Sequence, residues 1–347
     1  MNFSDELVNW YTENKRDLPW RHTTDPYIIW LSEIILQQTR VEQGLPYFHR
    51  FAEKYPTVTD FAAADETEIL KLWQGLGYYS RGRNMLKTAR MVQELYDGRF
   101  PTKYDDLIKL KGIGEYTAAA IASFSSNEAK AVVDGNVYRV IARYLGIFEP
   151  INSPQGKKMF QSAANDFLNK KISAIHNQAM MEFGAMLCKP KNPACGICPV
   201  RLDCYAFKHN ATTSLPVKIN KLKIRERYFN YFLYTDGGRI LMNQRNEGDI
   251  WANMYDLPMF EADSLLSVNE LMAHPDVIEY FGPSLEIAAV SDIKKHVLTH
   301  QRLYIRFITV VKPPLKIEPN WIFIEVEKLK SLPLSKVIFI FLDNFLN

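Results

Sequence analysis

All four cysteines of the chain lie between residues 188 and 204, and this clustering constrains the fold more than any other feature of the sequence. They occupy positions Cys188, Cys195, Cys198 and Cys204. A secreted scaffold uses disulfides to close long loops, and it therefore spreads its cysteines along the chain. Four thiols this close together indicate a single metal centre instead.

The spacing alone leaves more than one kind of centre open. Structural zinc usually takes two short Cys-x-x-Cys pairs separated by a longer arm. This loop has one such pair, Cys195 and Cys198, with irregular outer spacings. Iron–sulfur cubanes use four cysteines at varied spacings. Zinc remains an alternative on spacing, and four free thiols in one loop would be a coincidence.

Length and composition predict two folded domains in a soluble protein. The 347 residues exceed the usual size of one domain, and a hydrophobic content of 47% supplies substantial cores. No apolar run approaches the roughly 18 residues needed to cross a membrane. The first residues lack the basic and apolar regions of a secretory signal. We expect a cytoplasmic protein with no membrane partner, and the net charge of +3 does not by itself indicate nucleic acid.

The texture of the sequence changes near residue 207. The part before it reads as mostly helical, with one helix opening at 60–64 and continuing through Trp73, and another at 117–124. Residues 208–226 carry an excess of basic side chains around Pro216. We interpret them as a linker, which either lies along an anionic partner or is a plain solvated spacer.

Residues 227–347 read as an α+β module. Strand patterns occur at 228–235, at 239–245 after a Gly-rich turn, and at 297–311. Helical patterns occur at 265–272, and the apolar run 337–342 reads as a buried strand or helix.

Gly112 and Gly114 form a Gly-x-Gly turn between two predicted helices. Glycines permit positive φ and expose backbone N–H groups at a helix start, which suits a phosphate oxygen, although an ordinary tight turn is the simpler interpretation. Further along, Asp134 precedes Gly-Asn and a helical pattern, so it is a good N-cap. One carboxylate oxygen can cap the helix while the other faces an electron-poor sugar.

Glu33 lies in a helical pattern on a face shared with Ile29, Trp30 and Gln37. A carboxyl on that face is partly desolvated, which raises its pKa. A general acid at neutral pH needs such a shift. Taken alone, a glutamate at the rim of a helix is the simpler interpretation.

Together these motifs resemble one family of enzymes. The hairpin followed by Asp134 resembles the helix-hairpin-helix glycosylase superfamily, and the cysteine spacing resembles the cluster loop of endonuclease III and MutY glycosylases. Residues 31–41 closely match the catalytic motif of the MutY-type adenine DNA glycosylases, whereas endonuclease III-like members lack the acid at Glu33. The resemblance implies a mainly α catalytic domain at 1–207 with a [4Fe–4S] cluster in loop 188–204.

The resemblance also implies roles for single residues. Glu33 would protonate adenine, an ionised Asp134 would stabilise the sugar cation, and Tyr116 and Asn136 would position these groups and the water. Strand-cleaving members carry a lysine in place of Tyr116, so a monofunctional glycosylase is implied. The implied adenine and DNA contacts are Trp20, Arg21, Gln38, Thr39, Leu76, Tyr78, Gly112, Gly114 and Gln178, with Lys189 and Lys191 near phosphates.

Residues 250–258 resemble the Nudix-like C-terminal domain of the same family, implied here at 227–347. No Glu-rich magnesium-binding run follows residue 225, so the domain is expected to bind rather than to hydrolyse. Leu298, Thr299 and His300 match a Phe-Ser-His-type loop that the family places against 8-oxoguanine, and Leu298 lacks the aromatic ring.

The implied partner is double-stranded DNA with an A:8-oxoguanine or A:G mispair, bound by a monomer in the nucleoid region of the cytoplasm. Two alternatives remain open. One is an endonuclease III-like glycosylase/lyase for oxidised pyrimidines, and the other is a non-catalytic DNA-binding iron–sulfur protein.

Overall fold

The computed structural model describes residues 3–219 and 224–346 and divides into two compact units. The first comprises residues 1–64 and 83–220, and the second comprises residues 65–82 and 221–347. Lys221 and Lys223 of the predicted basic linker lie outside the described residues. In the described part of the chain, no helix combines the length and apolar character needed to cross a membrane.

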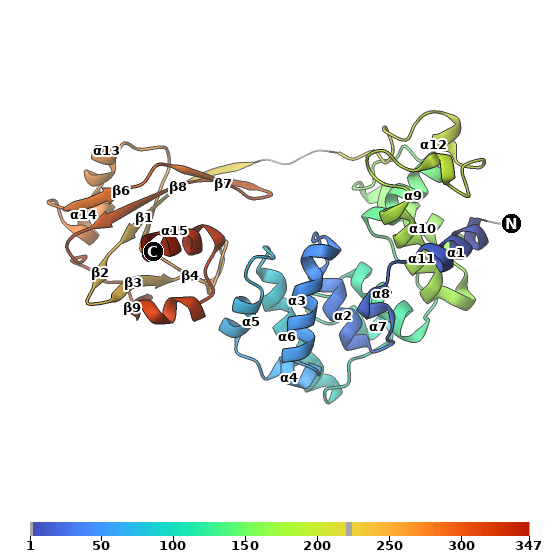
Figure 1. Cartoon of the computed structure of the whole chain (residues 1–347), viewed down its shortest axis with the longest axis horizontal. Helices are drawn as coiled ribbons and strands as arrows, with labels where there is room; N and C mark the ends of the chain where they lie inside the picture. The colour runs from blue at the N-terminus through green and yellow to red at the C-terminus, as the bar shows by residue number, and fades with distance from the viewer. Residues whose placement is uncertain (1–2, 220–223, 347) are drawn as a thin grey trace. The chain divides into compact units, whose positions relative to one another are not determined.

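The first unit is helical (Figure 1). Its elements are α1 (Phe3–Asn14), η1 (Pro19–Arg21), α2 (Pro26–Ile35), α3 (Val41–Lys54), α4 (Val58–Ala62), α6 (Ser80–Tyr96, whose first residues count with the second unit), α7 (Tyr104–Leu107), α8 (Glu115–Ser126), α9 (Gly135–Leu145), α10 (Pro154–Phe167), η2 (Lys170–Ile172), α11 (Ser173–Met186), η3 (Cys195–Ile197) and α12 (Tyr205–Lys208).

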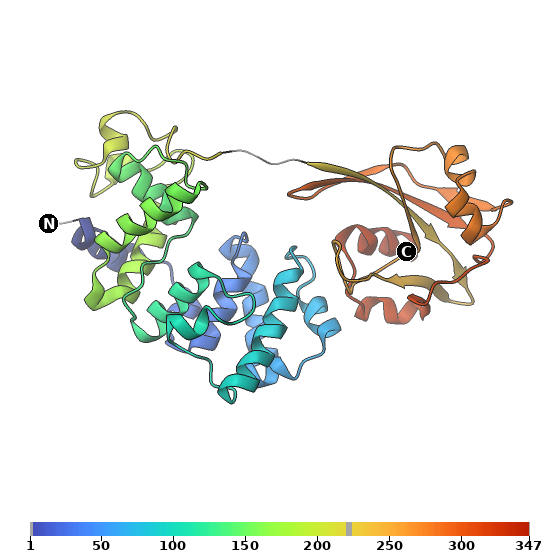
Figure 2. The same cartoon turned by 180° about the vertical axis from the view of Figure 1, so that it is seen from behind.

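Two pairings between distant segments shape this unit. Helix α1 packs against α11, and α2 packs against α8, as both views show (Figures 1 and 2). A core formed by α1, α9, α10 and α11 includes the fully buried side chains Leu7, Ile141 and Phe160. Burying such side chains contributes about 1.5–3 kcal/mol each.

The same core extends past the cysteine loop. Ala211 and Leu215 are buried in it, although both fall inside the predicted linker 208–226. The amide of Ile151 also donates a hydrogen bond to the carbonyl of Val217 at 3.0 Å. The early part of that segment therefore packs on the first unit rather than forming a solvated spacer.

The single helix predicted from 60–64 through Trp73 is wrong, because the structure has two helices there. Helix α4 ends at Ala62, and α5 (Glu66–Leu72), which counts with the second unit, begins after Asp65. The Asp65 side chain accepts a hydrogen bond from the amide of Thr67 and caps α5. The apolar pattern continues across the break, and only the capping aspartate marks it.

Besides α5, the second unit contains two sheets. The larger sheet has the order β5 (Met259–Ala262), β1 (Arg225–Leu233), β8 (Gln301–Val310), β6 (Ile287–Val290), and β7 (Lys294–Val297) also pairs with β8. The smaller sheet has the order β2 (Thr235–Asp236), β3 (Arg239–Gln244), β4 (Tyr255–Asp256), and β9 (Trp321–Glu325) also pairs with β3. Strands β1 and β8 run parallel.

Both faces of the larger sheet are covered. A core between the two sheets contains Tyr231, Met242 and Phe307 together with Ile338 of α15 (Lys336–Leu346). The opposite face packs Phe232 and Ile308 against α13 (Val268–Met272) and α14 (Pro275–Phe281). A short 3-10 helix, η4 (Val326–Ser331), follows β9.

The predicted strands 228–235 and 239–245 do not form one long hairpin. The first is interrupted at Tyr234, so only β2 pairs with β3, and β1 joins the other sheet. Because of this break, consecutive residues contribute β1 to the larger sheet and β2 to the smaller one. The apolar run 337–342, left open between strand and helix, is helical in α15.

Candidate active site

Glu33 lies on α2, a helix that is buried on nearly all sides. Asp25 caps its N-terminus and Pro26 occupies the first helical position, so the helix starts at a defined residue. Glu33 is 8% exposed. Burial raises its pKa to about 7, against an opposing hydrogen bond from Tyr116, with Asp134 raising it further and Arg21 lowering it.

Tyr116 connects this carboxyl to the predicted hairpin. Its hydroxyl donates a hydrogen bond of 2.5 Å to Glu33 Oε2. Burial and the two nearby carboxylates raise the pKa of Tyr116 well above its usual value, so the hydroxyl keeps its proton. Tyr116 sits in the first turn of α8, two residues after the N-cap residue Gly114.

Asp134 is the N-cap of α9, as predicted. Its Oδ1 accepts hydrogen bonds of 2.8 Å from the amides of Asn136 and Val137. The other oxygen, Oδ2, accepts a 2.8 Å bond from the Asn136 side chain. Burial raises the pKa of Asp134, and these three hydrogen bonds oppose the rise. One oxygen therefore caps the helix while Asn136 holds the second.

Arg139 links Asn136 to the cysteine loop, and the sequence analysis did not single it out. Its Nη2 donates to Asn136 Oδ1 at 2.7 Å and to the carbonyl of Gly184 at 2.8 Å, and its Nε donates to the carbonyl of Cys188 at 2.7 Å. A continuous series of hydrogen bonds thus joins Asp134 to the loop. One signal could have pointed to it: Arg139 lies in the helix whose N-cap is the candidate site residue Asp134.

Glu182 is a second residue that the sequence did not single out. Burial raises its pKa, but hydrogen bonds from Arg16 and Arg21 outweigh burial and lower the pKa to about 2. Arg16 Nη2 and Arg21 Nη2 lie 2.7 and 2.6 Å from Glu182 Oε2. Arg21, a predicted substrate contact, is therefore fixed by a carboxylate of α11.

The remaining predicted adenine contacts are held by neighbours. Gln178 Oε1 accepts a hydrogen bond of 2.7 Å from the Tyr11 hydroxyl. The amide oxygen of Gln178 is thus used by Tyr11, and this bond does not involve its NH₂ group. Trp20 is buried, with its ring 5.1 Å from that of Phe48.

The predicted hairpin glycines behave differently from each other. Gly112 has φ +80, and a Cβ there would lie 2.9 Å from the Cβ of Asn84, so the position needs glycine. Gly114 has φ −94 and ψ 178, an extended conformation open to any residue. The expectation that both glycines supply positive φ is wrong for Gly114, because the turn needs only one left-handed residue.

Of the predicted DNA contacts in the turns after α2 and α5, some are exposed and one is buried. Gln38 has φ 55 and is exposed in the turn after α2, with Thr39 half-buried beside it. In the second unit, Leu76 is 7% exposed, whereas Tyr78 is 42% exposed with φ 48. The simpler interpretation of core packing therefore fits Leu76 in this structure, and Gln38 and Tyr78 are available to a partner.

The other candidate DNA contacts are exposed. Thr299 and His300 lie in the turn between β7 and β8, and the Thr299 and Tyr78 hydroxyls, both in the second unit, are hydrogen-bonded. Lys189 and Lys191 are exposed on the cysteine loop. Leu298 packs against the core between the two sheets, so this side chain faces inward.

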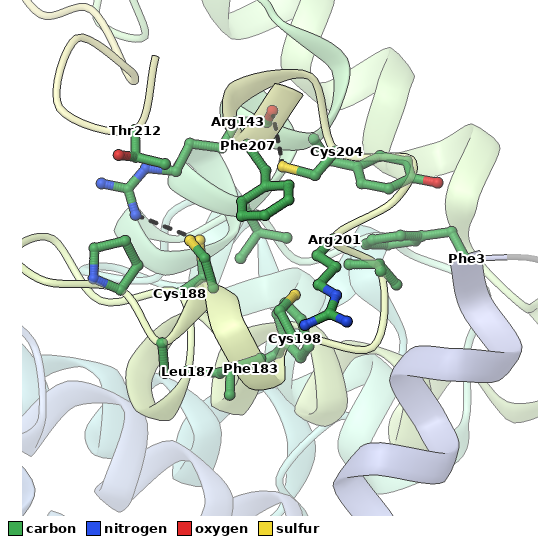
Figure 3. Close-up of a pocket in the computed structure, with 16 residues that line it drawn as sticks. Phe3, Arg143, Phe183, Leu187, Cys188, Cys198, Arg201, Cys204, Phe207 and Thr212 are labelled. Atoms are coloured by element: carbon green, nitrogen blue, oxygen red, sulfur yellow. Dashed lines mark hydrogen bonds between the residues drawn. The ribbon is translucent and has the colours of Figure 1, made fainter. Parts of the chain in front are cut away.

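The four cysteines line one cavity (Figure 3). Arg143 braces it, because its Nη1 lies 3.4 Å from Cys188 Sγ and also donates to the carbonyl of Lys189 at 2.7 Å. Burial raises the pKa of Cys195 and Cys204, and that of Cys198 to about 12. The sequence prediction that the four thiols share one site agrees with this cavity.

Family models match both units. Residues 31–176 match the HhH-GPD superfamily base excision DNA repair protein, and residues 230–344 match a NUDIX domain. Among solved structures, a thermostable thymine-DNA glycosylase has a TM-score of 0.55 at 30% identity, covering 59% of this chain and 95% of that chain. Endonuclease III in a non-covalent complex with DNA has a TM-score of 0.52 at 24% identity, covering 60% and 94%, which supports the fold alone.

Curated relatives agree with these matches. The adenine DNA glycosylase of Buchnera aphidicola subsp. Schizaphis graminum is 37% identical over 75% of this chain and 75% of the relative. That of Buchnera aphidicola subsp. Baizongia pistaciae is 32% identical over 92% and 88%. The Homo sapiens enzyme is 40% identical over 59% and 39%. The predicted helix-hairpin-helix and Nudix-like folds are confirmed, and the chain belongs to the adenine DNA glycosylase family.

Proposed function

We propose that this protein removes adenine mispaired with 8-oxoguanine, and more weakly with guanine, from double-stranded DNA. The observation that carries the proposal is the buried Glu33 carboxyl, with a pKa of about 7 and a hydrogen bond from Tyr116. About half of such groups hold a proton at neutral pH. A carboxyl of this kind can act as a general acid where an ordinary glutamate is fully ionised.

The reaction needs an acid because adenine is a poor leaving group. The target nucleotide must first leave the base stack, since its glycosidic bond is not accessible inside a duplex. Proton transfer from Glu33 to N7 of the extruded adenine then lets the base leave as a neutral molecule. The C1′–N9 bond breaks, and C1′ gains oxocarbenium character.

Asp134 supplies the second function in this proposal. Its carboxylate, fixed by three hydrogen bonds, is suited to stabilise positive charge at C1′ without reorganising. Asn136 orients the carboxylate, and Tyr116 orients Glu33. Water then adds to C1′ and releases a proton, which restores the protonated form of Glu33 and completes hydrolysis.

Tyr116 also supports a monofunctional glycosylase. A lyase needs an amine nucleophile that forms a Schiff base with the sugar. The hydroxyl of Tyr116 cannot form one, and it is already committed to Glu33. This argues against the endonuclease III-like alternative.

The cysteine cavity fits a [4Fe–4S] cluster better than a single ion. All four thiols line it, yet no three His, Cys, Asp or Glu side chains in residues 3–219 and 224–346 are arranged to hold one metal ion. Zinc requires its thiolates about 2.3 Å from one point, whereas a cubane separates them. We propose Cys188, Cys195, Cys198 and Cys204 as its ligands; the cluster, when bound, would supply a structural and redox-active centre.

The second unit supports recognition of the opposite base. Thr299 and His300 are exposed in one turn and present a hydroxyl and an imidazole, both able to hydrogen-bond a modified purine. Gly112, Gly114, Gln38, Thr39 and Tyr78 are proposed as backbone and minor-groove contacts, with Trp20, Arg21 and Gln178 at the adenine. Leu76 is also proposed as such a contact, and it would have to leave its buried position to make it. We propose further that the protein acts as a monomer at the nucleoid in the cytoplasm.

Single-turnover excision tests the proposal. The wild type is expected to release adenine from A:8-oxoguanine duplexes faster than from A:G duplexes, and Glu33→Gln is expected to bind the same duplex but barely cut it. Normal excision by Glu33→Gln would refute the acid assignment. Robust borohydride trapping, or excision from thymine-glycol duplexes, would favour the glycosylase/lyase, and no excision by the wild type would favour a non-catalytic DNA-binding protein.

A further inference from the structure

The larger sheet of the second unit has a small polar pocket on the face that also carries α13 and α14. Four cross-strand pairs of β1 and β8 lie on this face: Glu226 with Arg302, Tyr228 with Tyr304, Asn230 with Arg306, and Phe232 with Ile308. The last pair is covered by the helices. The third pair lines a small pocket, bordered by Ser264 and Leu266.

Arg306 is an unpaired cation in this pocket. It is 7% exposed, and its Nη2 donates to the carbonyl of Leu266 at 2.7 Å. Its Nη1 is buried without a hydrogen-bond partner, and no ion pair joins Arg306 to an acid within the described part of the chain. Burial alone accounts for the lowering of its pKa. Buried guanidinium groups are normally paired, because a desolvated charge without a partner is costly.

Aromatic and basic side chains border the pocket, and no acidic side chain among the residues that the structure describes lines it. The rings of Tyr228 and Tyr304 stack at 5.2 Å and 14°, and Lys295 lies over the Tyr304 ring at 5.6 Å. Glu226, an acid on this face, accepts hydrogen bonds from both tyrosine hydroxyls, at 3.4 and 3.1 Å. Its charge is also offset by Arg302, at 3.9 Å. Arg306 therefore has no competing internal anion.

We propose that the pocket at Arg306 binds one phosphoryl group of a nucleotide or of the DNA backbone. A guanidinium fork matches phosphate geometry, and stacked tyrosines with lysine nearby are typical of surfaces that bind nucleotides. The pocket is too small to enclose a whole small molecule, so a ligand could present only a single charged group to Arg306. This site is separate from Glu33 and Asp134 and does not depend on adenine excision.

Phosphate binding is the first test. Inorganic phosphate and dGMP are titrated separately into the full chain at constant ionic strength, with chloride as the compensating anion, and the Tm is recorded. Both are expected to raise the Tm of the wild type. Arg306→Met should lose the rise, and it should fold at least as stably without phosphate because it removes an unpaired buried charge. Arg239→Met is the matched control, since Arg239 is exposed on β3 and paired with Asp236.

DNA binding distinguishes the two sources of the phosphoryl group. If the DNA backbone occupies the pocket, Arg306→Met weakens binding of an undamaged duplex several-fold and reduces the slope of log K against log salt by about one, and Arg239→Met does not. If free nucleotide occupies it, Arg306→Met leaves the slope unchanged and loses only the rises in Tm with phosphate and dGMP. Equal behaviour of Arg306→Met and wild type toward phosphate, dGMP and DNA would overturn the proposal.

Discussion

Glu33→Gln should stabilise the folded protein, and the gain should grow as the pH rises. The carboxyl has a pKa of about 7 in the folded chain, against an ordinary value of 4.5. Since each pKa unit corresponds to about 1.4 kcal/mol, ionising this buried group costs the folded state about 3 kcal/mol. Glutamine keeps the shape of the side chain and carries no charge at any pH.

The sign of the effect follows from proton linkage. Below pH 4.5 Glu33 is neutral in both folded and unfolded chains, so its contribution to stability is fully present. As the pH rises toward 7 the unfolded chain releases its proton first, and that stability is lost. The free energy of unfolding of Glu33→Gln, minus that of the wild type, should therefore rise by about 2.5 kcal/mol between pH 5 and pH 8.

Urea unfolding followed by far-ultraviolet circular dichroism, which reports the helical first unit, measures this difference. Glu182→Gln is the matched control with the opposite shift. Its pKa is lowered to about 2, so its stability is present above pH 4.5 and is lost only as the pH falls through about 2. That variant should be destabilised equally at pH 5 and pH 8. A flat or falling difference for Glu33→Gln would refute the assignment of a raised pKa.

Three further changes probe the contacts around the site. Tyr116→Phe removes the hydrogen bond that lowers the acid's pKa, so the alkaline limb of single-turnover excision should move up by about one pH unit, and an unmoved limb would contradict the pairing. Gly184→Ala should destabilise the protein by about 1–3 kcal/mol and slow excision, because the new Cβ would lie 2.7 Å from Asn136 Cβ; wild-type Tm and rate would argue against this packing. Tyr11→Phe frees the amide of Gln178 to flip, so discrimination of adenine from 2-aminopurine should fall while the Tm changes little, and unchanged discrimination would exclude a role for this bond.

The sequence predicted the residues whose chemistry depends on local motifs. Asp134 was recognisable as an N-cap from the Gly-Asn that follows it, and the four cysteines from their clustering. The fold class followed from periodicity together with the family resemblance. These features share one property, which is that neighbours in the chain determine them.

Residues that act through distant partners were not predictable in this way. Glu182 belongs to no recognisable motif, and its pKa falls because two arginines from the segment after α1, more than 160 positions away in the chain, donate hydrogen bonds to it. Arg139 joins two segments 49 positions apart. The expectation that the strands at 228–235 and 239–245 pair with each other was wrong for the same reason, since β1 pairs with β8, which is distant in sequence.

The pairing of α1 with α11 has a consequence for synthesis of the chain. Helix α1 ends at Asn14, whereas its partners α9 and α11 begin only at Gly135 and Ser173, so these contacts cannot form until those residues have been made; Tyr116 is made before Glu182, so Glu33 can pair with Tyr116 before Glu182 can hold the segment after α1. Apolar residues of α1 such as Leu7 stay unburied during that interval. The nascent chain therefore offers an exposed hydrophobic helix to chaperones for most of the time needed to make its catalytic half.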